Sequence, residues 1–150
     1  MRKIVIFGAT ALMLAVVAGS ASAAPAPKAT GGVNWVGGSG GDLMIHASFN
    51  AHGTDPAKGE VVLFTSDGSI SYKGDVECYA QNGNRAALAG PITEGGGGFT
   101  HFIFWVEDNG EGKKASGPDR IQTSRRNAMP ACSTQAPVQL VTGGNLQVHE

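Results

Sequence analysis

Apolar and polar residues alternate along most of the chain, a pattern typical of β-strands that bury one face. Leu43, Ile45, Ala47 and Phe49 share one face of a first such strand, which starts near residue 42. Similar short runs follow at 60–66, 69–79, 84–93, 99–107, 119–123, 138–142 and 145–149. Short strands at this spacing, separated by Gly-bearing turns, predict an all-β domain, an antiparallel sandwich or barrel.

Local signals refine this pattern. Gly68 and Gly83 each follow a turn-forming Asp or Asn and predict tight hairpins, since Gly adopts positive φ without strain. Pro91 predicts that the run at 84–93 is an edge strand or a strand end. The run at 99–107 is apolar on both faces and predicts a central strand.

The N-terminus does not show this alternation of apolar and polar residues. Arg2 and Lys3 precede an apolar run at 4–17, and the small residues Ala21-Ser22-Ala23 follow it. This pattern is typical of a bacterial signal peptide cleaved after Ala23. The run is short for a membrane span, which needs ~20 residues, although an uncleaved anchor or a buried helix would share its composition. We therefore expect residues 1–23 to be removed and the protein to be secreted.

Residues 24–41 are rich in Pro and Gly, and we expect a flexible lead before one β domain at 42–150. Val33, Trp35 and Val36 form an apolar patch in this lead that could pair as a short strand. The mature chain of 127 residues would have nine basic and twelve acidic residues, a net charge of about −3 with neutral histidines. Such a charge argues against nucleic acid as a partner.

The sequence holds two cysteines, Cys78 and Cys132. An even count in an exported protein predicts a disulfide, and only one intramolecular pairing exists. Two buried free thiols or an intermolecular bridge are the alternatives.

Several short segments, taken in order, resemble a group of secreted bacterial β-domain proteins of actinobacterial type that are mostly described only as hypothetical. The segments are Ala47-Ser48-Phe49-Asn50-Ala51, Gly74-Asp75-Val76-Glu77-Cys78, Gly83-Asn84-Arg85-Ala86, Val106-Glu107-Asp108-Asn109-Gly110-Glu111, Asp119-Arg120-Ile121 and Gly144-Asn145-Leu146-Gln147-Val148-His149. The resemblance implies an extracellular all-β module, and it implies no catalytic residues.

The most prominent polar cluster comprises Asp108, Asn109 and Glu111, on a long loop at 108–118, and Asp119, which follows that loop. Oxygen ligands on a Gly-bearing loop suit Ca²⁺. The alternative is a turn whose Asp and Asn side chains bond their own backbone. Because loops on rigid scaffolds often bind partners, we expect the binding site here.

Other candidates carry weaker signals. Ser39 formally matches the G-x-S-x-G nucleophile pattern, but a Gly run predicts a linker instead. The four histidines, His46, His52, His101 and His149, lack zinc-site spacing. The aromatic residues Trp35, Tyr72, Tyr79 and Trp105 could stack on sugars, although such residues more often fill a core.

These observations predict a secreted, non-catalytic domain without a cofactor, which binds a partner or belongs to a surface or matrix. A cell-wall polymer and an extracellular protein are the candidate partners. An inhibitor of an extracellular hydrolase is the alternative function, and a small secreted enzyme is a third hypothesis.

Overall fold

The computed structural model describes residues 25–37, 41–112 and 115–149. These residues form nine β-strands and no α-helix. The strands are β1 (Lys28–Gly37), β2 (Leu43–His52), β3 (Lys58–Thr65), β4 (Ser71–Asp75), β5 (Cys78–Asn82), β6 (Arg85–Gly95), β7 (His101–Glu107), β8 (Arg120–Arg126) and β9 (Gln139–His149). The predicted all-β fold class is confirmed.

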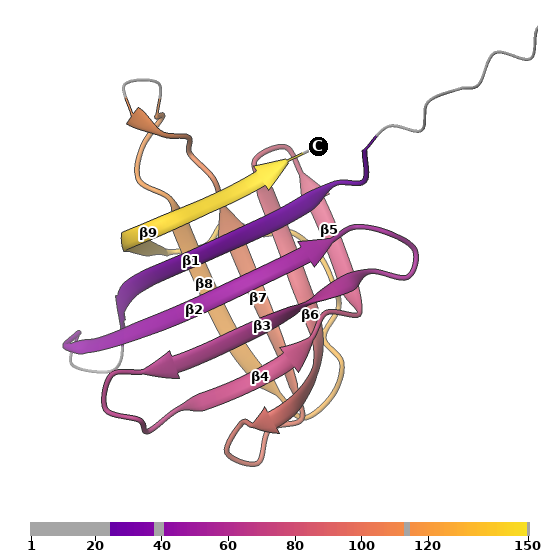
Figure 1. Ribbon diagram of the computed structural model, residues 1–150, viewed down its shortest axis with the longest axis vertical. Coiled ribbons are helices and arrows are strands. Elements are labelled where there is room, and N and C mark those ends of the chain that lie inside the picture. The colour runs from indigo at the N-terminus through magenta and orange to yellow at the C-terminus, as the bar shows by residue number, and fades with distance from the viewer. Residues whose placement is uncertain (1–24, 38–40, 113–114, 150) are drawn as a thin grey trace, which may run out of the picture.

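The sheet closes into a barrel. Its antiparallel strands follow the order β4-β3-β2-β1-β9-β8-β7-β6-β5, and a further pairing joins β4 to β6. β4 and β5 are two halves of one run, interrupted at Val76 and Glu77, and both pair with β6. The barrel therefore has eight strands, with β1–β4 and β9 crossing in front of β5–β8 (Figure 1). Closure is weakest between β8 and β9, which pair at only two positions.

Pro91 lies inside β6, so the predicted edge strand or strand end was wrong. The pairing of β6 with β5 ends at Ala89, and its pairing with β4 begins at Ile92. Pro91 sits between these two ladders, where neither strand faces it. Its missing N–H therefore costs no ladder hydrogen bond on this edge.

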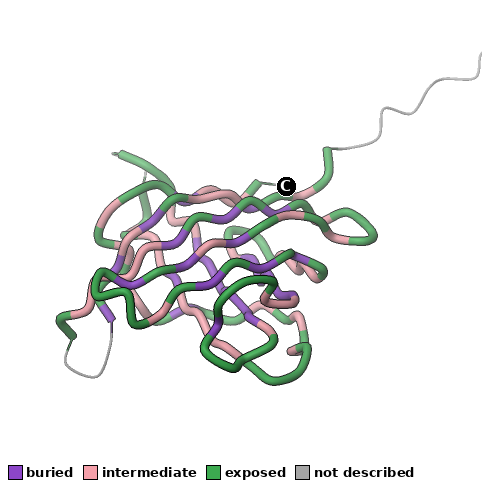
Figure 2. Tube along the Cα trace, turned by 60° about the horizontal axis from the view of Figure 1, so that its bottom comes forward, coloured by how far each residue is buried: buried purple, intermediate pink, exposed green. Residues whose placement is uncertain are grey.

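Buried residues alternate with more exposed ones along several strands (Figure 2), and most of the buried apolar residues form one core cluster. Phe104 packs edge-to-face against Phe49 and Phe102, with ring centroids 6.1 Å and 5.7 Å away. Gly31 of β1 faces Phe49 of β2, and a Cβ at Gly31 would lie 2.6 Å from Phe49 Cζ. This glycine thus makes room for the ring.

β1 corrects the predicted domain boundary. The segment expected to be a flexible lead supplies a ten-residue strand, which pairs with β2 along its whole length and with β9 from Lys28 to Trp35. Trp35 in this strand is completely buried. The barrel therefore begins at Lys28, because apolar residues in the lead complete its core. The predicted signal peptide at 1–23 and Ser39 lie outside the described residues.

The predicted hairpin turns are confirmed, with φ of 72° at Gly68 and 57° at Gly83. The two short strands expected at 138–142 and 145–149 are instead one strand, β9. Its register against β1 shifts between Asn34 and Trp35, where Thr142 has no register partner, and the nearby Gly144, opposite Val33, has a φ of 93°. A Cβ at Gly144 would meet the carbonyl oxygen of Gly32, so only glycine fits this position.

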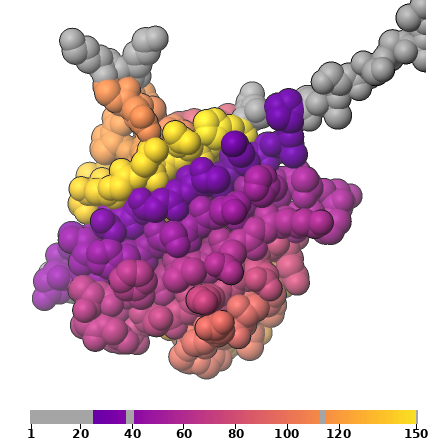
Figure 3. All heavy atoms as spheres, viewed as in Figure 1, coloured from indigo at the N-terminus to yellow at the C-terminus, as the bar shows by residue number. Residues whose placement is uncertain are grey.

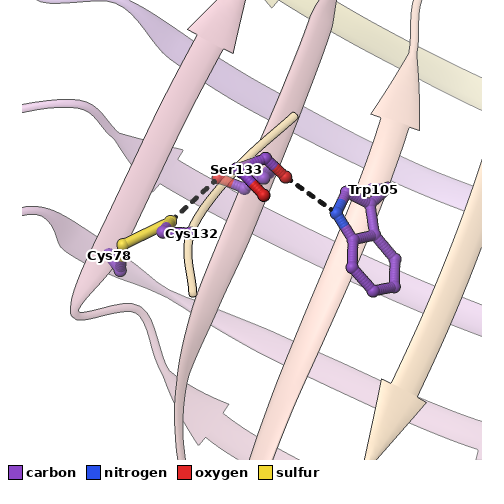
Figure 4. Close-up of a disulfide and its surroundings, with 5 residues drawn as sticks. Cys78, Trp105, Cys132 and Ser133 are labelled. Carbon is purple, nitrogen blue, oxygen red and sulfur yellow. Dashed lines mark hydrogen bonds between the residues drawn. A yellow bond between two sulfur atoms is a disulfide. The ribbon is translucent and has the colours of Figure 1, made fainter. Parts of the chain in front are cut away.

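Residues 127–138, which we call the strap, run from β8 back to β9 over the outside of β5–β7. The predicted disulfide ties Cys132 of the strap to Cys78 of β5 (Figure 4). Trp105 Nε1 donates a hydrogen bond to the Ser133 carbonyl oxygen at 3.0 Å. The strap covers Ile103 and Trp105, which explains why β7 is apolar on both faces. β8 extends to Arg126, beyond the run predicted at 119–123.

Candidate functional site

The acidic loop at 108–119 projects from the barrel beside β9 (Figure 3). Both carboxylate oxygens of Asp108 accept backbone hydrogen bonds of 2.9 Å, one from Gly110 N and one from Val148 N. The first bond is the local turn that the sequence offered as the alternative to a calcium site. The second fastens the loop to β9.

Asn109 and Asp119 join the two ends of this loop. Asn109 N donates to Asp119 Oδ1 at 2.9 Å, and Asn109 Nδ2 donates to the Pro118 carbonyl oxygen at 2.8 Å. Burial raises the pKa of the Asp119 carboxyl, with the nearby charges of Asp108 and Glu111 adding to the rise and the Asn109 N–H opposing it. Glu111 is exposed and takes part in none of the hydrogen bonds found among the described residues. The loop therefore uses most of its polar groups to hold its own shape.

The histidines and acidic residues do not assemble a metal centre in the described part of the chain. His46 bonds Asn34 and stacks on Phe64, with ring centroids 4.8 Å apart, on the outside of the barrel. His101 contacts the hydroxyl of Thr100, and His149 contacts Gln147.

The four aromatic residues considered as a sugar platform lie in different places. Trp35 is in the core, and Trp105 is 9% exposed beneath the strap. Tyr79 donates to Gln81 Oε1 on β5, and burial raises its pKa to about 12. Tyr72 lines a cavity beside β8. They share no common surface.

A cavity opens where β8 separates from β9. The two strands pair only through Arg120 with Leu140 and Ile121 with Gln139. Beside the rest of β8 lies a space of about 300 Å³, which we call the barrel cavity. Its lining residues come from β2, β3, β4, β8 and the adjoining turns: Ile45, Leu63, Thr65, Ile70, Tyr72, Phe99, Thr123, Ser124 and Arg125. Eight-stranded barrels are just wide enough to hold one small ligand.

Arg125 occupies an interior position of the barrel. In the ladder between β7 and β8, Arg125 pairs with Phe102. Two residues earlier on β8, Thr123 pairs with Phe104. Arg125 Nη1 donates to the Gly96 carbonyl oxygen at 3.1 Å, and the guanidinium lies 4.8 Å from the centroid of the Phe99 ring. Neither of the two ion pairs among the described residues involves Arg125.

Tyr72 faces the same cavity and is 3% exposed. Burial raises the pKa of its hydroxyl well above the ordinary value, while the positive charge of Arg125 acts in the opposite direction. The hydroxyl is therefore a neutral hydrogen-bond donor at physiological pH. Among the hydrogen bonds of the described residues, none involves this hydroxyl.

Sequence reasoning missed the barrel cavity because the predicted strand ended at Thr123. Extending the alternation of Ile121 and Thr123 by one step would have placed Arg125 on the inward face. An arginine at an inward position is unusual enough to mark a site, because charged side chains are rarely buried without a partner.

A second, more open cleft of about 540 Å³ lies between the acidic loop and β9. Glycines line much of it, together with Glu111, Asp119 and Asn145. Its charged groups are acidic, and one of them, Asp119, already accepts the Asn109 N–H.

Fold and cavity together define a closed antiparallel barrel with a small, partly apolar site beside its shortest strand pairing. No family model matches the chain, and no curated protein or solved structure is significantly similar to it. The resemblance to secreted actinobacterial β-domain proteins thus stays a prediction. No helix in the described residues is long and apolar enough to cross a membrane.

Proposed function

We propose that this protein is an exported, non-catalytic binding protein whose ligand site is the barrel cavity. The single observation that carries the proposal is the cavity itself, a partly apolar space whose wall includes the cationic side chain of Arg125 and the hydroxyl of Tyr72. Ligand sites are typically concave and apolar with a few polar groups that orient the ligand. A volume of about 300 Å³ lies at the small end of the usual ~300–1,000 Å³.

The composition of the cavity wall supports binding over catalysis. Its lining includes no histidine, carboxylate or cysteine, the groups that most often move protons or act as nucleophiles. The hydroxyl–imidazole pair of Thr100 and His101 is exposed and lies outside the cavity lining. This pair has no carboxylate among its hydrogen-bond partners to orient the imidazole ring.

Export is supported by the N-terminal pattern and by the disulfide between Cys78 and Cys132. Disulfides persist mainly in oxidising compartments. Mass spectrometry of culture medium should find a mature chain that starts at Ala24, and an intact Met1 there would contradict export.

The binding test uses N-phenyl-1-naphthylamine, a neutral probe that fluoresces in apolar surroundings. We expect the wild-type protein to bind it and Thr123→Phe, which fills the barrel cavity, to lose it. Thr93→Phe makes the same change at an exposed position of β6 and should bind normally. Absence of binding by the wild type, or equal binding by Thr123→Phe, would overturn the proposal.

The second candidate function is inhibition of an extracellular hydrolase. It is favoured by the projecting acidic loop, whose two ends are joined by hydrogen bonds from Asn109. A loop held in one shape loses little entropy when it enters a partner's site. Purified protein should then inhibit a secreted protease or glycosidase, and Asp119→Ala, which releases the loop, should weaken inhibition.

A further inference from the structure

We propose that the barrel cavity selects small amphipathic anions, with an apolar body in the barrel and a carboxylate headgroup held by Arg125 and the Tyr72 hydroxyl. This inference rests on the proposed function and specifies its ligand class. Its basis is that an inward arginine and an unpaired phenol lie on the wall of one cavity, together with the apolar side chains of Ile45, Leu63, Ile70 and Phe99.

The charge of Arg125 is available to a ligand. The guanidinium carries five N–H donors in a planar fork, and the described residues use one of its nitrogens, for Gly96. No carboxylate of the described residues forms an ion pair with it. The Phe99 ring lies against the guanidinium without neutralising its charge. A carboxylate is the complement that such a fork binds through two parallel hydrogen bonds.

Tyr72 supplies the second donor. Its ring stacks on Phe102, with centroids 6.4 Å apart, and Phe102 is the residue that pairs with Arg125 across β7 and β8. The positive charge of Arg125 is close enough to Tyr72 to influence its ionisation. Both groups therefore offer hydrogen atoms within one small cavity, and an anion satisfies both.

Apart from the short side chains of Thr65, Thr123 and Ser124, the rest of the cavity wall is apolar and suits an apolar ligand body. Ile45, Leu63, Ile70 and Phe99 present only hydrocarbon, and the Thr65 hydroxyl already bonds Asp67 at 2.6 Å. A second charge on the ligand would lose its hydration beside these groups without gaining a partner, and this desolvation is unfavourable. The favoured ligand thus carries one charge, at one end.

The experiment compares octanoate with 1-octanol as displacers of bound N-phenyl-1-naphthylamine. The two share an apolar chain and differ in the headgroup. We expect octanoate to displace the probe at a roughly ten- to hundredfold lower concentration, the range expected of hydrogen bonds to a charged group. Arg125→Gln should erase this preference while the neutral probe still binds, and Tyr72→Phe should reduce it in part.

Two further variants keep the test specific. Arg125→Lys retains the charge and should recover part of the preference. Arg126→Gln removes the same charge from the exposed neighbouring position of β8 and should leave the preference unchanged. Thermal unfolding of each variant checks that the barrel is intact.

The outcomes are distinguishable. If the wild type does not bind the neutral probe, the proposed function fails. If the probe binds but octanoate and 1-octanol displace it equally, or if Arg126→Gln matches Arg125→Gln, the anion inference fails while the binding function stands.

Discussion

The acidic loop and the barrel cavity are both polar regions, but they differ in how their polar groups are used. In the loop, Asp108 accepts two backbone hydrogen bonds and Asp119 accepts one, so these carboxylates stabilise the chain itself. In the cavity, Arg125 keeps most of its donors free and Tyr72 has no partner among the described residues. A polar group already bonded to its own fold offers little to a ligand, so the cavity is the better site.

The largest expected effect is a loss of stability in the strap, which lies outside both the acidic loop and the barrel cavity. It serves as a reference for the smaller effects in those two regions. Cys78→Ser opens a loop between residues 54 apart in sequence and releases the strap. The free energy of unfolding should fall by ~2–5 kcal/mol. Denaturant unfolding measures this loss. Probe binding below the unfolding transition should be unchanged, since no cavity residue belongs to the strap.

The double variant Cys78→Ser/Cys132→Ser should be little worse than the single one, because either change alone removes the bond. A count of two free thiols in the unfolded, non-reduced wild type would contradict the disulfide.

Asp108→Ala, in the acidic loop, should lower stability and leave ligand binding in the barrel cavity unchanged. It leaves Gly110 N and Val148 N without their acceptor, and we expect a loss of ~1.5–3 kcal/mol in unfolding free energy. Binding of N-phenyl-1-naphthylamine should stay at the wild-type level. Glu111→Ala, on the same loop but exposed, is the control and should be neutral. Weaker probe binding by Asp108→Ala would mean that the loop shapes the cavity.

Phe99→Ala, in the barrel cavity, should weaken ligand binding and change stability little. The ring lies against the Arg125 guanidinium, and its loss removes a cation–π contact of about 0.5–1 kcal/mol. We expect octanoate affinity to fall roughly two- to fivefold, with unfolding free energy changed by no more than about 1 kcal/mol. A titration of octanoate against bound probe measures the effect. Unchanged affinity would show that Phe99 does not orient the arginine.

The smallest effect concerns the pH dependence of Asp119. Burial raises its carboxyl pKa above the ordinary 3.8, so the folded state binds this proton more tightly than the unfolded state does. The associated stabilisation is complete below about pH 4 and is lost as pH rises through the folded pKa. Asp119→Asn should therefore gain stability relative to wild type as pH rises through that window. Urea unfolding at a series of pH values measures the difference.

Asp67 is the matched control for this titration. Hydrogen bonds from Thr65 and Ser69 lower the pKa of its carboxyl, so its contribution is lost as pH falls. Asp67→Asn should lose stability relative to wild type as pH rises from its lowered folded pKa to about pH 4, a window below that of Asp119. The same sign for both variants would contradict the assigned causes.

Much of the fold could be predicted because its signals are local. Alternation of Leu43 to Phe49 marked β2, and glycines at 68 and 83 marked the turns. The two-faced apolar run at 99–107 predicted a central strand, and β7 is central because the strap covers its outer face. β1 was underestimated because Pro and Gly around it resemble a linker, whereas its apolar residues matter only opposite β2 and β9.

The candidate site was less accessible to sequence reasoning. The acidic loop is conspicuous because its polar residues are adjacent in the chain. The barrel cavity joins Ile45, Tyr72 and Arg125, which are far apart in sequence and become neighbours only when β4 pairs with β6 and β8 leaves β9. A single arginine in a strand carries no signal until its inward direction is known.

The sequence by itself determined the strand content, the hairpin turns and the one intramolecular pairing open to its cysteines, because these follow from side-chain alternation, backbone φ and residue count. Only the tertiary structure decided that the sheet closes as a barrel, that Pro91 sits between two ladders and that Arg125 faces a cavity. The physical reason is that closure and cavities depend on strand register between distant segments. That register is set by the packing of the whole core, which no local pattern encodes.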